Sequence, residues 1–124
     1  MGVVFAVALG GAIGSALRFL LSKVVQEHFG ISFPVGTLFV NLVGAFFIGF
    51  FFAYLVDKLA VNPHARALLI TGLLGGLTTF STYSYESFSL LREGETLKFL
   101  AYTLGTNVLG IFFTFLGYIL GESL

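Results

Sequence analysis

Polar residues interrupt one hydrophobic segment of this chain at its centre. The segment spans residues 67–91, and its middle reads GGLTTFSTYSYES over residues 75–87. Lipid offers no partner to a free backbone N–H or C=O, so such an interruption is tolerated only inside protein or beside a polar cavity. A helix broken at the membrane midplane is typical of a transport site.

Two aromatic residues and several hydroxyls give this segment its chemistry. Phe80 and Tyr83 lie three residues apart and share one helix face. They would form an ordinary core pair in a soluble helix, but the edge of an aromatic ring is positive and can also stabilise an anion beside a polar path. The hydroxyls beside them belong to Thr78, Ser81 and Thr82.

Three further polar residues fall at membrane depth, and each has two interpretations. Arg18 follows Gly11 and Gly14 on one helix face, and it either extends to the headgroups or attracts anions in a wet vestibule. Asn41 either joins two helices or donates its amide N–H to a desolvated anion. Glu86 is either a partner for Arg18 or for backbone donors, or a gating or proton-carrying carboxylate.

Hydropathy predicts the elements that position these residues. The chain of 124 residues is 57% hydrophobic and 10% charged, with a mean hydropathy of +1.02. A membrane-spanning helix needs about 20 mostly apolar residues, and four segments qualify: residues 3–21, 35–55, 67–91 and 97–120. We therefore expect an all-α membrane protein, one four-helix transmembrane domain over residues 1–124, with the third helix broken at its centre.

A polar stripe on the fourth segment allows two interpretations. It consists of Thr103, Asn107, Gly110, Thr114, Gly117 and Gly121, with Tyr102 and Thr106 beside it. Half of the stripe is small residues, which let helices approach closely. Helix packing and a polar path therefore explain it equally well.

The loop charges indicate how the chain inserts. Lys and Arg in excess normally mark the cytoplasmic side. Here one side carries Lys58 and Arg66, and the other carries Lys23, Arg92 and Lys98. So weak a bias, in a chain too short to enclose a pore, suggests two copies inserted in opposite directions and paired as an antiparallel homodimer.

Several functional classes lack support in the sequence. There is no GxxxxGK, HExxH or GxSxG motif, so we do not expect an enzyme. Six basic against six acidic residues argue against nucleic-acid binding. Zero cysteines exclude disulfides and cysteine-ligated metals, and His28 and His64 are expected in loops, solvated rather than ligating.

The motifs resemble those of one family over essentially the whole chain. GGLTTFSTYSYE, GTLFVNLVGAFFIG, the opening GGAIGSALRF and the final span, in this order, are similar to the Fluc (CrcB) family of small bacterial fluoride channels. The resemblance implies a dual-topology homodimer with two fluoride pores and a structural Na⁺ at the two-fold axis.

The resemblance also implies roles for individual residues. Phe80 matches the first aromatic of the family's paired pore phenylalanines, and Tyr83 stands where the second phenylalanine is usual. Asn41 matches the pore asparagine, and Arg18 matches the vestibule arginine. Other matched positions are a polar track at Thr106, Gly110 and Thr114, and Na⁺ ligation by main-chain carbonyls at Gly75 and Thr78.

The leading hypothesis is therefore a passive fluoride channel in a bacterial or archaeal cell (inner) membrane, with fluoride, a second copy of the chain and the lipid bilayer as its partners. One rival is a small proton-coupled multidrug exporter, which depends on a membrane-embedded glutamate in its first helix; residues 3–21 contain none. Another rival is a non-transporting subunit that packs in a larger complex.

Overall fold

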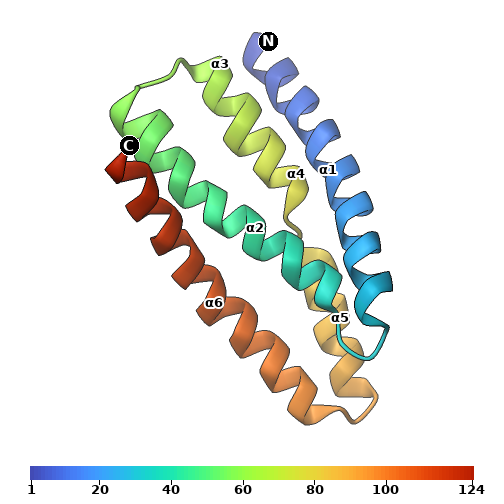
Figure 1. Cartoon of the computed structure of the whole chain (residues 1–124). Coiled ribbons are helices and arrows are strands. Elements are labelled where there is room, and N and C mark those ends of the chain that lie inside the picture. The colour runs from blue at the N-terminus through green and yellow to red at the C-terminus, as the bar shows by residue number, and fades with distance from the viewer.

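The computed structural model describes all 124 residues and contains helices but no strands. The elements group into four long helical segments, whose arrangement is drawn in Figure 1. Their bounds are α1 Gly2–Phe29; α2 Val35–Phe51, continued by the π-helical η1 Phe52–Lys58; α3 Pro63–Arg66, η2 Ala67–Leu74, α4 Gly75–Leu77 and α5 Phe80–Arg92; and α6 Thr96–Ser123.

Glycines bring α1 and the third segment into contact. A Cβ at Gly10 would collide with the Leu68 carbonyl oxygen, and one at Gly14 would collide with the Leu73 carbonyl oxygen. Gly72, on the opposing helix, also lies close to the backbone of α1, where a Cβ would meet the Val7 carbonyl oxygen. The small residues of α1 therefore have the packing role that small residues commonly have between membrane helices.

A second glycine-lined contact joins α2 to α6, which run side by side in Figure 1. A Cβ at Gly49 would meet the Thr114 carbonyl oxygen, and one at Gly117 would meet the Phe46 carbonyl oxygen. Gly121 lies against Ala53 and the Phe50 carbonyl. Of the two interpretations of the polar stripe, helix packing is confirmed for Gly117 and Gly121.

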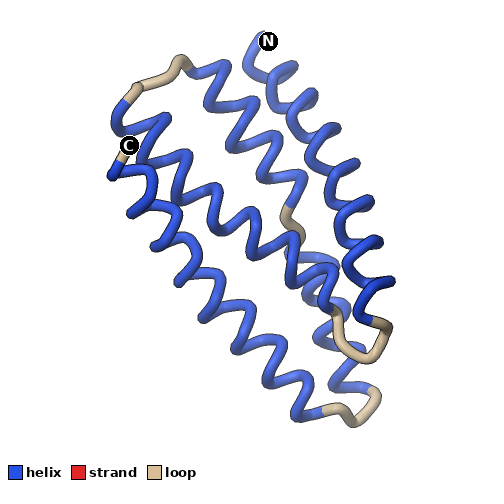
Figure 2. The backbone as a smooth tube through the Cα atoms, in the orientation of Figure 1, coloured by secondary structure: helices blue, strands red, loops and turns tan.

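The third segment is interrupted at Thr78 and Thr79, as the loop between α4 and α5 shows in Figure 2. Both residues are extended, with φ/ψ of −94°/158° and −148°/121°. Threonine is β-branched and favours extended backbone. The Thr79 hydroxyl also accepts a hydrogen bond from the Thr82 N–H at 3.2 Å, which caps the new helix. The expected break is confirmed, and it follows the glycine pair rather than coinciding with it.

Three helices are long and apolar enough to cross a membrane by length and composition: Gly2–Phe29, Val35–Lys58 and Thr96–Ser123. The third segment is missing from this group because the break divides it. The expected loop positions of both histidines are wrong: His28 lies in the last turn of α1 and His64 in α3, and both side chains are exposed.

Candidate functional site

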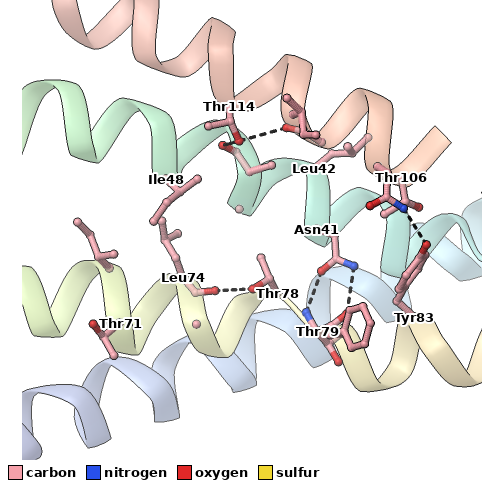
Figure 3. Close-up of a pocket in the computed structure, with 18 residues that line it drawn as sticks. Asn41, Leu42, Ile48, Thr71, Leu74, Thr78, Thr79, Tyr83, Thr106 and Thr114 are labelled. Carbon is pink, nitrogen blue, oxygen red and sulfur yellow. Dashed lines mark hydrogen bonds between the residues drawn. The ribbon is translucent and has the colours of Figure 1, made fainter. Parts of the chain in front are cut away.

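A cavity of about 540 Å³ lies beside the break, between α2, the third segment and α6 (Figure 3). No charged residue lines it. The structure brings seven of the predicted site residues together there: Asn41, Gly75, Thr78, Phe80, Tyr83, Thr106 and Thr114. The cavity therefore offers hydroxyl and amide groups and ring edges, but no fixed charge.

Asn41 holds the interrupted backbone. Its Nδ2 donates to the Thr79 carbonyl at 3.2 Å, and its Oδ1 accepts from the Thr79 N–H at 2.8 Å (Figure 3). The amide thus replaces the helical bonds that the extended residue cannot make. An asparagine carries two amide protons, and the second remains available at the cavity, so the two interpretations of Asn41 are compatible.

The two predicted threonines of α6 differ in their hydrogen bonding. Thr114 donates its hydroxyl proton to the Ala45 carbonyl at 2.8 Å and lies 3.1 Å from the Gly110 carbonyl. The Thr106 oxygen is buried and has no hydrogen-bond partner in the protein. A buried polar group without a partner carries a free-energy penalty, so Thr106 is the hydroxyl in this cavity that needs a ligand or water.

Phe80 and Tyr83 both line the cavity, with ring centroids 5.7 Å apart and planes tilted by 52°. Tyr83 also lies 5.2 Å from the ring of Tyr102. Phe80 is 78% exposed in the single chain. An apolar ring so exposed beside a polar cavity requires a further surface to cover it in the membrane or in an assembly.

Four predicted site residues do not line the cavity: Arg18, Ser81, Thr82 and Glu86. The Arg18 Nε donates to the Gly76 carbonyl at 2.9 Å, near the end of α4. A cation there is favourable because the C-terminal end of a helix carries partial negative charge. The Ser81 hydroxyl lies 3.4 Å from that of Thr79.

Glu86 is paired with a residue that the sequence did not indicate. The Tyr102 hydroxyl donates to the Glu86 Oε1 at 2.9 Å. The salt bridge in the structure joins Lys98 to Glu95, and Arg18 does not pair with Glu86, so that one of the alternatives for Glu86 is not found. The reason is geometric, since Arg18 reaches the break while Glu86 lies further along α5.

The break leaves backbone carbonyls, rather than a cluster of side chains, as the groups that could ligate a cation. The structure has no group of three His, Cys, Asp or Glu side chains that could hold a metal. In a continuous helix the Thr79 N–H would bond to the Gly75 carbonyl, but here it bonds to Asn41. The Thr78 carbonyl lies in the extended stretch and accepts no backbone hydrogen bond.

The α5–α6 hairpin explains the partners that the sequence interpretation missed. Glu86 and Tyr102 are equally far from Gly94 along the chain, and Tyr83 and Asn107 are equally far from Glu95. The Asn107 Nδ2 donates to the Tyr83 hydroxyl oxygen at 3.1 Å. Antiparallel helices joined by a short turn bring together residues at similar distances from the turn, so pairing residues about Gly94 and Glu95 would have indicated both contacts.

A broken helix, a neutral polar cavity at the break and helices of membrane-spanning length define a small helical membrane protein of the channel and transporter class. The family model described as "CrcB-like protein, Camphor Resistance (CrcB)" matches residues 5–118. The chain belongs to this family, as its motifs indicated.

Curated relatives align over nearly their whole length. The chain is 47% identical over 119 residues to the "Fluoride-specific ion channel FluC" of Hydrogenobaculum sp., covering 96% of this chain and 97% of the relative. It is 49% identical over 118 residues to the protein of that name from Thermus thermophilus, covering 95% and 94%. A relative of the same name from Rhizobium meliloti is 43% identical over 115 residues, with 90% and 92% covered.

Proposed function

We propose that this protein is a fluoride-selective passive ion channel of the cell membrane, which releases fluoride from the cytoplasm. The observation that carries the proposal is the uncharged cavity at the helix break, where the buried Thr106 hydroxyl has no protein partner. The relatives named as fluoride-specific channels support it.

The cavity residues account for anion passage without tight binding. Fluoride is small and strongly hydrated, so a narrow path must replace its water shell with donors. Thr106 offers a hydroxyl, Asn41 an amide N–H, and Phe80 a positive ring edge. Because no fixed positive charge lines the cavity, these neutral groups hold the anion weakly enough to release it.

A passive channel suffices for export. Hydrogen fluoride crosses membranes as a neutral acid and ionises in a near-neutral interior, so the anion accumulates inside. A negative interior then drives an anion outward by about 2.3 kcal/mol per 100 mV. No energy source is required of the protein, and no catalytic step is proposed.

The proton-coupled exporter is the weaker candidate. The helix α1 extends to Phe29 and so includes Glu27, but that side chain is exposed near the helix end rather than at membrane depth. Glu86 lies on α5, and it already accepts a hydrogen bond from the Tyr102 hydroxyl. Neither carboxylate has the position that an exporter of this kind uses.

We infer that residues 1–124 form one four-helix domain and that two copies pair as an antiparallel homodimer. Ser81, Ser84 and Asn107 are exposed on the single chain within helices that we place in the membrane. Lipid offers them no hydrogen-bond partner, whereas a second copy covers them. The weak charge bias of the loops permits both orientations.

A structural Na⁺ is part of the same proposal. The Gly75 and Thr78 carbonyls would hold it at the interface of the two copies, because both lie at the break without their helical donors. Bound there, the cation would neutralise the partial negative charge of the broken helix end. Arg18, which donates to the Gly76 carbonyl, stabilises the same end.

Efflux from liposomes that contain only this protein tests the function. We expect fluoride efflux that persists when the proton gradient is collapsed, and no chloride efflux. Efflux that requires a proton gradient would support the exporter, and no ion flux at all would support the packing subunit.

The absence of cysteine allows a direct test of the orientation. Ser32 lies exposed between α1 and α2, so a Ser32→Cys variant carries a single accessible thiol. We expect a membrane-impermeant thiol reagent to label about half of the protein from each side. Labelling from one side only would contradict the antiparallel arrangement.

A further inference from the structure

Asn107 and Tyr83 form a polar pair across the α5–α6 hairpin. The Asn107 Nδ2 lies 2.8 Å from the Thr103 carbonyl oxygen and 3.1 Å from the Tyr83 hydroxyl oxygen. A carbonyl oxygen can only accept, so the Thr103 carbonyl fixes the amide with its nitrogen toward both atoms. An amide nitrogen only donates, and the Tyr83 oxygen is therefore the acceptor.

This arrangement determines where the Tyr83 proton can point. A tyrosine hydroxyl has one proton, and its oxygen already accepts a hydrogen bond from Asn107, so the proton must point away from the Asn107 nitrogen. The hydroxyl donates to no protein group in the structure, although Tyr83 lines the cavity together with Asn107 and Thr106. The proton is left free for an acceptor in the cavity.

Donation by Asn107 also strengthens the hydroxyl as a donor. Hydrogen bonds in a chain polarise one another, by about 10–30% per bond. This series of hydrogen bonds, from the Asn107 amide to the Tyr83 hydroxyl, ends in an O–H that has no protein acceptor. An anion would accept that last hydrogen bond.

We infer that Asn107 is a positioning residue for fluoride: it holds the Tyr83 hydroxyl so that its proton faces the anion path. The inference rests on the proposed channel function and adds Asn107 to the residues that act on the anion. A phenylalanine at position 83 would leave Asn107 without its acceptor on α5.

A double-mutant cycle tests the inference in liposomes that contain the full-length protein. The variants are Asn107→Leu, Tyr83→Phe and the two combined. One hydrogen bond of about 1 kcal/mol corresponds to about a five-fold change. We expect each single variant to raise the half-saturating fluoride concentration about five-fold, and the combined variant to raise it no further.

Two outcomes would overturn the inference. If Asn107→Leu leaves the half-saturating concentration unchanged, Asn107 positions nothing. If the two effects multiply, to about 25-fold, Asn107 acts independently of the Tyr83 hydroxyl, as a residue that only packs helices would.

The controls separate this inference from the channel proposal and from misfolding. Val108→Leu changes the adjacent, exposed position of α6, which does not line the cavity, and should conduct as the parent protein does. If Asn107→Leu does not fold, Asn107→Ala removes the same amide without placing a charge in the cavity lining; the same loss is expected, and unchanged fluoride dependence refutes the inference. Absence of fluoride efflux from the parent protein refutes the channel proposal itself.

Discussion

Replacing Asn41 should weaken the helix break by an amount that its two hydrogen bonds set. Asn41→Leu removes the partners of both the N–H and the carbonyl of Thr79. Each polar group that loses its partner lowers stability by about 1–3 kcal/mol. The lower end of this range applies to each of the two groups because Thr79 is only half-buried. We therefore expect a loss of about 2 kcal/mol in the free energy of unfolding.

Asn41→Asp separates the two bonds. Its carboxylate still accepts from the Thr79 N–H but places an oxygen against the Thr79 carbonyl, so about half of the loss, about 1 kcal/mol, is expected. Unfolding in mixed micelles with increasing SDS gives the free energies, with Phe39→Leu as the control at an exposed position of α2 outside the cavity.

Fluoride efflux from the same variants distinguishes the two roles of Asn41, which are to stabilise the backbone at the break and to donate a hydrogen bond to fluoride. Asn41→Asp should keep more stability than Asn41→Leu yet suppress efflux, because a carboxylate in the cavity lining repels an anion. The reasoning fails if Asn41→Leu is as stable as Phe39→Leu, or if Asn41→Asp conducts normally.

Three other substitutions test separate residues of the site. Thr106→Val should lower fluoride efflux without lowering stability, because the hydroxyl has no protein partner to lose; a destabilised Thr106→Val protein in SDS unfolding would contradict this. Phe80→Ile should abolish or greatly reduce efflux while gel filtration shows an unchanged assembly, because isoleucine has no positive ring edge; normal efflux would exclude Phe80 as a ligand. Arg18→Ala should reduce stability by about 1.5–3 kcal/mol to a similar extent at low and high salt, because its bond to the Gly76 carbonyl is half-buried; a salt-dependent loss of conductance at unchanged stability would instead support a vestibule role.

Hydropathy predicted the four helical segments because burial in lipid dominates the free energy of such a chain, but it misplaced one helix end. The span at residues 3–21 ends just before Lys23, whereas α1 continues to Phe29. Lys23, Gln26 and Glu27 are good helix formers outside lipid. The helix ends only at Gly30, whose φ of 86° favours glycine.

The break was predictable and its consequences for hydrogen bonding were not. Paired glycines and adjacent threonines indicate an interruption, but they do not say which carbonyls lose their donors. That depends on Asn41, which reaches Thr79 from another helix, and on Arg18, which reaches Gly76. Contacts between distant residues of this kind depend on the rotation of each helix, which hydrophobic spacing sets only approximately.

The partners of the α5 side chains were missed for a different reason. Periodicity within one helix groups residues by face, and it placed Tyr102 and Asn107 beside or on a stripe of α6 without relating them to α5. Their partners Glu86 and Tyr83 follow from the hairpin turn at Gly94 and Glu95 instead. A comparison of residues across each short turn would have supplied this information.

The reversal potential of the current through the purified protein in a planar bilayer tests the central claim most directly. With a tenfold fluoride gradient and equal chloride on both sides, the current through a fluoride-selective channel should reverse at about 59 mV from zero. The sign should be that of the fluoride equilibrium potential. A chloride gradient at equal fluoride should leave the potential at zero. A potential that follows chloride or protons would contradict the account.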